Sequence, residues 1–396
     1  MKILVVNAGS SSLKYQLIDM DNEQAIVRGL IERVGQKMST VEYKWNGKKY
    51  TYEEPIADHT QALTIVLQSL VGKDAPLKSI DEIDGVGHRV VHSGEKFVTS
   101  VKLGDNTIKD IEAISDLAPL HNPANIAGIK ACLTVLPNKP AVAVFDTSFH
   151  STMPDYAYMY AIPYQLYKNH QIRKYGFHGT SHLYVSTEAT KLLGNKEAKI
   201  VVCHLGNGAS VSAVRRGKCI DTSMGFTPLE GLSMGTRSGD IDPSVIEYIM
   251  KKTGQNIGET LNLLNKKSGM LGVSEISSDF RDILAARSAG DTKATLAINM
   301  FCYRVKKYIG SYVAAMNGLD ALVFTAGVGE NSWTLREQIC SDLEYLGIDI
   351  DDQKNKNPEN HKGEISKDTA KSKVFVIPTN EELVIARETL RYGFYK

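Results

Sequence analysis

KILVVNAGSSSLKYQLIDM, residues Lys2–Met20, joins two apolar, strand-like runs through a turn of small residues. AKIVVCHLGNGASVSAV, residues Ala198–Val214, repeats that plan in the second half of the chain. After each copy the chain turns and enters a further strand-like stretch. A repeat of this size indicates repeated architecture. We therefore predict two similarly built domains, each with one small-residue hairpin turn.

The other segments have the alternation of an α/β protein. Short, β-rich apolar runs occur as VGHRVVH, AVAVF, DALVFTAG and KVFVIP, and several read as strands buried on both faces. Helical patterns separate them, as in QALTIVLQSLV, NIAGIKACLTVL, KATLAINMFCYRVKKYIGSYVAAM and EELVIARETLR. Strands that alternate with helices favour largely parallel central strands.

Composition narrows the class of protein. The 396 residues include 46 basic and 45 acidic side chains, a formal charge of +1, which gives no support to a nucleic-acid or membrane partner. The four apolar residues after Lys2 are too few for a signal-peptide core, and no run approaches the roughly 18 residues of a membrane span. Five scattered cysteines without C-x-x-C spacing favour a reducing compartment. We expect a cytoplasmic enzyme.

The first turn, NAGSSSLK (Asn7–Lys14), has two interpretations. It could be a plain surface hairpin, or it could bind phosphate oxygens through close backbone N–H groups, the hydroxyls of Ser10–Ser12 and the ammonium of Lys14. The chain contains no Walker loop and no G-x-G-x-x-G opening a helix after the first strand. A nucleotide site here would therefore be of the hairpin type.

Ten ordered motifs identify a family. NAGSSSLKYQLID, GHRVVHSGEKF, LAPLHNP, VFDTSFH, RKYGFHGTSH, HLGNGAS, MGFTPLEGL, MGTRSGDIDP, FTAGVGENS and IPTNEEL together resemble the acetate kinases, the acetokinase family, from Lys2 to Thr389. The resemblance implies an α/β fold of two duplicated actin-like, ribonuclease-H-like domains with an interdomain nucleotide cleft. It places residues 1–148 plus about 378–396 in the N-terminal domain and residues 149–377 in the nucleotide-binding domain.

The implied reaction is reversible transfer of the ATP γ-phosphoryl group to acetate, which gives acetyl phosphate and ADP. Positioning and charge stabilisation dominate such catalysis. The resemblance assigns carboxylate binding to Arg89, stabilisation of the developing charge to Arg237, hydrogen bonds to the phosphoryl group to His121 and His178, and an acid/base role to Asp146. Acetate is already ionised at neutral pH. Asp146 could therefore instead orient a magnesium-bound water or Arg237.

The resemblance also implies the binding groups. The methyl pocket would consist of Val91, Leu120, Phe177 and Pro228. The metal would be Mg²⁺, with Mn²⁺ as a substitute, held by Asn7 and Glu381. ATP contacts would come from four segments: Ser10, Ser12 and Lys14; His204, Leu205, Gly206, Asn207 and Gly208; Asp279, Phe280 and Arg281; and Gly327, Val328, Gly329, Glu330 and Asn331. The small-molecule substrates would be acetate and ATP, and a homodimer is expected.

Two glutamates follow each other in PTNEEL. Thr379-x-x-Glu382 has the spacing of a capping box, in which Glu382 would reach back to the N-cap. That interpretation leaves Glu381 for the metal. His178 and His182 have i, i+4 spacing, but without H-E-x-x-H we expect no zinc site.

Two other functions stay open. The first is a kinase of the same family that prefers propionate or butyrate, because one methylene in such a pocket discriminates by only ~1–3 kcal/mol. The second is an ATP-switched binding protein of the actin or Hsp70 kind, which would not need Arg89, His121, His178 and Arg237 together. Pyrophosphate could replace ATP among relatives, but GVGEN favours a nucleoside.

Overall fold

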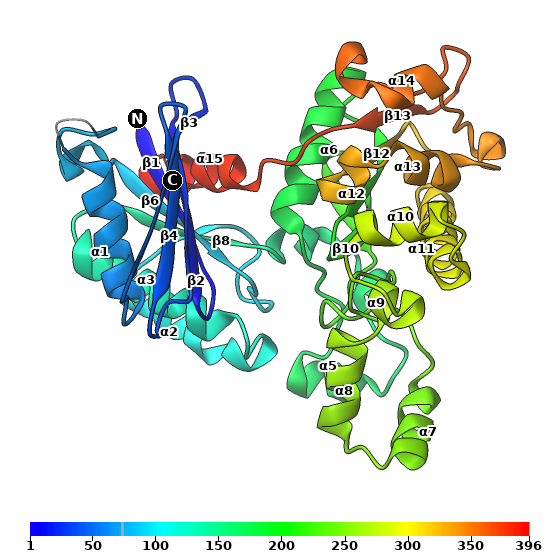
Figure 1. The fold of residues 1–396 in the computed structure, drawn as a ribbon, viewed down its shortest axis with the longest axis horizontal. Helices are drawn as coiled ribbons and strands as arrows, with labels where there is room; N and C mark the ends of the chain where they lie inside the picture. The colour runs from blue at the N-terminus through cyan, green and yellow to red at the C-terminus, as the bar shows by residue number, and fades with distance from the viewer. Residues whose placement is uncertain (73–74, 396) are drawn as a thin grey trace. The chain divides into compact units, whose positions relative to one another are not determined.

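The computed structural model describes residues 1–72 and 75–395 of the chain. The chain divides into two compact units (Figure 1). Unit 1 comprises Met1–Phe149 and Asn380–Lys396, and unit 2 comprises His150–Thr379. The C-terminal segment therefore belongs with the N-terminal half of the sequence.

Unit 1 is built on an eight-stranded mixed sheet in the order β5-β4-β3-β2-β1-β6-β8-β7. Its strands are β1 (Lys2–Ala8), β2 (Ser12–Asp19), β3 (Gln24–Glu32), β4 (Ser39–Trp45), β5 (Lys48–Glu54), β6 (Gly85–Val90), β7 (Val101–Lys102) and β8 (Ala141–Phe145). Strand β1 is antiparallel to β2 and parallel to β6, and β6 is parallel to β8. The N-terminal hairpin thus forms the middle of the sheet.

Unit 2 repeats this arrangement in a five-stranded sheet, β11-β10-β9-β12-β13. Its strands are β9 (Lys199–Leu205), β10 (Ala209–Arg215), β11 (Lys218–Thr222), β12 (Ala321–Thr325) and β13 (Lys373–Val376). Strand β9 is antiparallel to β10 and parallel to β12, as β1 is to β2 and β6. The order and directions match β3-β2-β1-β6-β8 of unit 1. The prediction of a duplicated α/β architecture is confirmed.

The helices divide between the two units. Unit 1 contains α1 (His59–Leu70), α2 (Asp105–Ala113), α3 (Asn122–Val135) and α15 (Glu381–Phe394). Unit 2 contains α4 (Asp155–Tyr158), α5 (Tyr164–His170), α6 (Gly179–Leu193), α7 (Pro243–Thr253), α8 (Ile257–Lys266), α9 (Gly269–Ser274), α10 (Phe280–Ser288), α11 (Thr292–Met316), α12 (Ala326–Asn331), α13 (Trp333–Cys340) and α14 (Asp352–Lys356). Within the described residues, no helix combines the length and the apolar character that a bilayer crossing would require.

Alternation along β6 explains how unit 1 is layered. Val86 faces a core cluster that includes Leu63 of α1 and Cys132 of α3. Gly87, the next residue, faces the other way, towards α15. A Cβ on Gly87 would lie 2.3 Å from Thr389 Oγ1 and 2.6 Å from Ile385 Cγ2. The missing side chain therefore lets α15 pack directly on the central strands.

The start of α15 corrects one prediction. Thr379 is not the N-cap, and Glu382 does not close a capping box. Asn380 is the N-cap, and its side-chain oxygen accepts a hydrogen bond from the Leu383 N–H at 3.2 Å. Thr379 lies one residue earlier, where its hydroxyl instead donates to Ser181 Oγ at 2.8 Å. Asparagine is as favourable an N-cap residue as serine or threonine. The helix can therefore begin one residue later than the sequence predicted.

Candidate active site

The first turn is a tight hairpin in unit 1. The Gly9 N–H donates to the Ser12 carbonyl at 2.8 Å, and a Cβ on Gly9 would lie 2.7 Å from Ser12 Oγ. A side chain at position 9 would therefore have to displace the Ser12 hydroxyl. The Gly9 amide is thus engaged internally, while Ser10 is exposed and Ser12 is half-buried.

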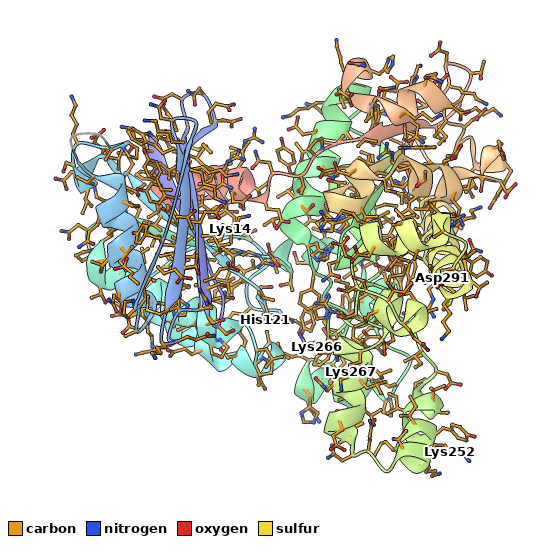
Figure 2. The ribbon with its side chains drawn as sticks, in the orientation of Figure 1. Lys14, His121, Lys252, Lys266, Lys267 and Asp291 are labelled. Carbon is orange, nitrogen blue, oxygen red and sulfur yellow. The ribbon has the colours of Figure 1, made fainter. Side chains whose placement is uncertain are left out.

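Lys14 follows the turn on β2 (Figure 2). It lies opposite Asn7 in the β1–β2 register, and its ammonium forms an ion pair with Glu382 of α15. The Lys14 side chain remains 52% exposed. This contact gives Glu382 a partner from the hairpin in place of the expected capping role.

Arg89 and Asp146 form the central ion pair of unit 1. Asp146 directly follows β8, and Arg89 lies on β6, the neighbouring parallel strand. The Arg89 Nε donates to Asp146 Oδ1 at 3.0 Å, and its Nη2 donates to Oδ2. The third nitrogen, Nη1, lies 3.5 Å from Asn7 Oδ1. The carboxylate of Asp146 therefore fixes the orientation of the guanidinium.

Charge and burial compete at this pair. Burial raises the pKa of Asp146, while the charge of Arg89 opposes that shift. Burial disfavours the Arg89 cation, but the carboxylate of Asp146 and the nearby charges of Glu381 and Glu382 raise the pKa of Arg89 above its ordinary value. Because arginine stays protonated in proteins, its two hydrogen bonds to the carboxylate favour the ionised form of Asp146.

Two buried asparagines of α3 bind the chain just after β6, and one of them also binds the end of β1. Asn125 accepts from the Val91 N–H at 3.0 Å and donates to the Ala8 carbonyl at 2.7 Å. Asn122 accepts from and donates to the backbone of His92, both at 3.1 Å. Our sequence reasoning missed both residues, although the N-P-A-N run that begins at the end of the LAPLHNP motif could have indicated them. They fix the chain around Arg89 and Val91.

His121 and Leu120 precede α3 in unit 1. His121 is the N-cap residue of α3 (Figure 2), and its side chain is close enough to lower the pKa of Asp146 slightly. Leu120 is 77% exposed, whereas Val91 is buried. The other two proposed methyl-pocket residues, Phe177 and Pro228, belong to unit 2. The four therefore form no common pocket within either unit.

Unit 2 brings His178, Arg237 and Pro228 to the second turn. A Cβ on Gly208 would lie 3.4 Å from His178 Nε2 and 3.6 Å from Arg237 Nη1, so the glycine leaves room beside both side chains. The Arg237 Nη1 also donates to the Pro228 carbonyl at 3.4 Å. Burial lowers the pKa of Arg237. His178 itself adopts a left-handed backbone with φ of 58° at the start of α6.

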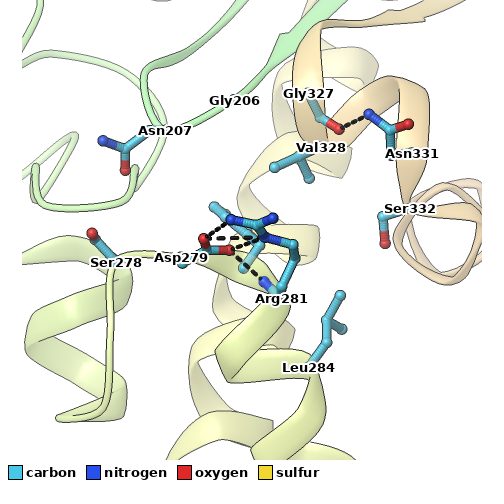
Figure 3. Close-up of a pocket in the computed structure, with 11 residues that line it drawn as sticks. Gly206, Asn207, Ser278, Asp279, Arg281, Leu284, Gly327, Val328, Asn331 and Ser332 are labelled. Carbon is cyan, nitrogen blue, oxygen red and sulfur yellow. Dashed lines mark hydrogen bonds and ion pairs between the residues drawn. The ribbon is translucent and has the colours of Figure 1, made fainter. Parts of the chain in front are cut away.

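A cavity of about 670 Å³ in unit 2 joins three segments of the sequence (Figure 3). Eight predicted ATP-binding residues line it: Gly206, Asn207, Asp279, Phe280, Arg281, Gly327, Val328 and Asn331. Ser278, Leu284 and Ser332 also line it and were not predicted. Ser278 and Ser332 adjoin predicted residues, and Leu284 lies one turn along α10. Extending each predicted segment by three residues would have included all three.

Hydrogen bonds between side chains and nearby groups hold the residues that line this cavity. The Arg281 guanidinium bonds Asp279, the N-cap of α10, with Nη2 at 2.6 Å from Oδ2. The Asn331 amide donates to the Gly327 carbonyl at 2.8 Å (Figure 3). Both pairs join residues of one segment, so each loop is braced locally.

The other predicted ATP residues do not line this cavity. His204, Leu205, Gly208, Gly329 and Glu330 belong to unit 2, and Ser10, Ser12 and Lys14 belong to unit 1. Leu205 is fully buried. The Glu330 carboxylate accepts from the backbone N–H groups of Ala326 at 2.8 Å and Thr379 at 3.2 Å. Glu330 therefore has a structural role, holding the start of α12.

Comparisons with known proteins cover nearly the whole chain. The model of the acetokinase family matches residues 2–387. The acetate kinase of Clostridium novyi (strain NT) is 55% identical over 98% of both chains. The crystal structure of Porphyromonas gingivalis acetate kinase superposes with a TM-score of 0.94 at 46% identity, over 99% of both chains. A propionate kinase from Francisella tularensis subsp. tularensis SCHU S4 gives 0.91 at 46%, over 98% of both.

Proposed function

This chain belongs to the acetokinase family, and we propose that it transfers the γ-phosphoryl group of ATP reversibly to acetate. It is a phosphotransferase with a carboxyl group as acceptor. A carboxylate oxygen of acetate attacks the γ-phosphorus in line, the bond to the bridging oxygen breaks, and ADP leaves. The observation that carries the proposal is the unit 2 cavity, because eight residues chosen by motif line one space of nucleotide-compatible size.

Arg89 is the proposed acetate anchor. Asp146 occupies its Nε and Nη2, so Nη1 is the nitrogen that we assign to the substrate carboxylate. Asp146 is then a positioning group. No proton has to leave acetate, which is ionised at neutral pH. His121, His178 and Arg237 would stabilise the charge on the transferring group.

Magnesium is the proposed metal, with Mn²⁺ as a substitute, and unit 1 contains oxygen donors that fit it. The amide oxygen of Asn7 lies beside Arg89, and Glu381 is close enough to shift the pKa of both Arg89 and Asp146. Mg²⁺ needs few protein ligands when substrate phosphates and waters complete its shell. Asn7 and Glu381 would hold the ion, which supplies charge neutralisation on the phosphate oxygens. In the described part of the chain no three His, Cys, Asp or Glu side chains form a metal cluster.

A second candidate function differs from the first only in the length of the carboxylic acid that the enzyme prefers. A propionate kinase of known structure is as similar in sequence to this chain as the acetate kinase of known structure is, so propionate preference is the alternative. We also propose that the protein is a cytoplasmic homodimer. Each subunit would consist of an N-terminal domain, residues 1–148 plus about 378–396, and a nucleotide-binding domain, residues 149–377. The resemblance to the family supports these proposals.

An acyl phosphate assay tests the function. We expect product from ATP with acetate, less from propionate and least from butyrate, at ~1–3 kcal/mol of discrimination per methylene, and no turnover after chelation of Mg²⁺. A higher kcat/KM for propionate would favour the alternative. Carboxylate-independent ADP release, with no acyl phosphate from any acid, would refute the kinase assignment.

A further inference from the structure

Three buried side chains connect to His178 in a row. Ser212 and Ser210 of β10 and His182 of α6 are each fully buried. The Ser212 hydroxyl lies 2.7 Å from His182 Nδ1. The opposite nitrogen, His182 Nε2, lies 2.7 Å from Ser210 Oγ, and that same oxygen lies 2.9 Å from His178 Nδ1. The alternating faces of β10 place both serines on one side, because residues i and i+2 share a face.

The direction of these hydrogen bonds follows from the Ser212 end. A buried hydroxyl has one proton to donate, and leaving it without an acceptor costs about 1–3 kcal/mol. Among the residues that the structure describes, the Ser212 hydroxyl has only His182 Nδ1 as a partner. Ser212 must therefore donate, and His182 Nδ1 must accept.

That direction passes along the row. Burial lowers the pKa of His182 well below its ordinary value, so the ring is neutral and carries its single proton on Nε2. This proton is donated to Ser210 Oγ. The Ser210 hydroxyl is then left to donate to His178 Nδ1, which must accept.

We propose that Ser212, His182 and Ser210 form a hydrogen-bond relay that keeps the His178 proton on Nε2, the ring nitrogen beside Gly208 and Arg237. This inference rests on the proposed function. In that tautomer His178 donates a hydrogen bond to a phosphoryl oxygen. In the other tautomer the same nitrogen would present a lone pair and repel that oxygen. The three residues are positioning residues, since they act through His178.

The relay has a direct spectroscopic test. In ¹⁵N-histidine-labelled full-length protein, two-bond ¹H–¹⁵N spectra report the tautomer of each ring, and the His178→Gln variant assigns the His178 signals. We expect His178 and His182 both to be neutral with the proton on Nε2. A His178 proton on Nδ1, or an imidazolium at neutral pH, would overturn the proposal whatever the enzymatic activity.

Variants add a kinetic test. Ser210→Ala should lower kcat by about 10- to 100-fold, as expected for one misdirected transition-state donor, with little change in KM for ATP or acetate. Its His178 spectrum should lose the preference for Nε2. Ser212→Ala should shift the His182 tautomer and lower kcat less. Ser186→Ala is the matched control, because among the described residues that buried hydroxyl of α6 donates only to the Leu183 carbonyl.

The outcomes separate the two proposals. A folded Ser210→Ala protein with wild-type kcat and an unchanged His178 spectrum would refute the relay. If Ser210→Ala does not fold, the wild-type spectrum and Ser212→Ala still decide. A wild-type protein that forms no acyl phosphate but shows the expected tautomers would refute the function and keep the relay.

Discussion

At the residue scale, the Arg89–Asp146 pair assigns roles that the motifs leave open. The aspartate could have served as an acid/base, a metal partner or an anchor for another arginine. Two hydrogen bonds to the Arg89 guanidinium make it the group that orients the proposed acetate anchor. The motifs identify both residues, but only the pairing of β6 with β8 brings them together across 57 positions of sequence.

Arg89→Ala and Arg237→Ala should each lower kcat by ~10³-fold or more, because an arginine can contribute that much to phosphoryl transfer. Arg89→Ala also leaves Asp146 buried without its partner, which should lower the melting temperature. An acyl phosphate assay with a thermal melt measures both. Arg33→Ala, which removes an exposed pair with Glu53, is the control. A folded Arg89→Ala protein with near-normal kcat would exclude the anchor role.

At the element scale, α15 links the end of the sequence to the β1–β2 hairpin at its start. It packs against β6 where Gly87 has no side chain, and its first turn contributes Glu381 and Glu382. The sequence predicts this helix correctly but not its cap, because Thr379 and Asn380 both suit the role. The hydrogen bond from Thr379 to Ser181 removes Thr379 from that competition, and this contact depends on residues far away in sequence.

Asn380→Ala should lower the free energy of unfolding by about 1 kcal/mol, the usual cost of losing an N-cap. Glu382→Ala should cost less than ~1 kcal/mol, because the Lys14 ammonium with which Glu382 pairs is half-exposed. Denaturant titration compares the two variants. A larger loss for Glu382→Ala than for Asn380→Ala would restore the capping-box interpretation.

Gly87→Ala should destabilise unit 1 by about 1–3 kcal/mol, since its methyl group would overlap the side chains of Thr389 and Ile385. Gly310→Ala is the contrasting control. Gly310 lies inside α11, and in the described part of the chain no atom other than those of its neighbouring residues and the nearby helix backbone lies within 4 Å of its would-be Cβ. Alanine should therefore be neutral or stabilise by up to about 1 kcal/mol. Equal denaturation midpoints for the two variants would contradict the close packing of α15.

At the scale of the whole molecule, buried neutral histidines make the free energy of unfolding depend on pH. Burial lowers the pKa of His88, His92 and His150 to about 4 each, from 6.5. These rings take up protons on unfolding once the pH falls below 6.5. The stability that they contribute is therefore complete above that pH and is lost as the pH falls towards 4. His88 lies in unit 1 and His150 in unit 2, so both units share this sensitivity.

The free energy of unfolding should thus fall steeply between pH 6.5 and 4. His88→Gln should reduce that slope by up to about 1.4 kcal/mol per pH unit, the contribution of one proton. His361→Gln, at an exposed position, should leave the slope unchanged. Denaturant titrations at several pH values measure it. An equal slope in the wild-type protein and His88→Gln would show that His88 does not titrate as its burial implies.

The sequence by itself determined the family, the duplicated α/β plan and the segments around the unit 2 cavity. These follow from local information: apolar runs, turns of small residues and ordered motifs such as FTAGVGENS. Tertiary structure alone decided the partners. Four sets of contacts join residues from different elements. These are Asp146 with Arg89, Lys14 with Glu382, Asn125 with Ala8 and Val91, and the row from Ser212 to His178. A buried polar group takes whatever partner the fold brings within about 3 Å, and strand pairing and helix packing decide which partner that is.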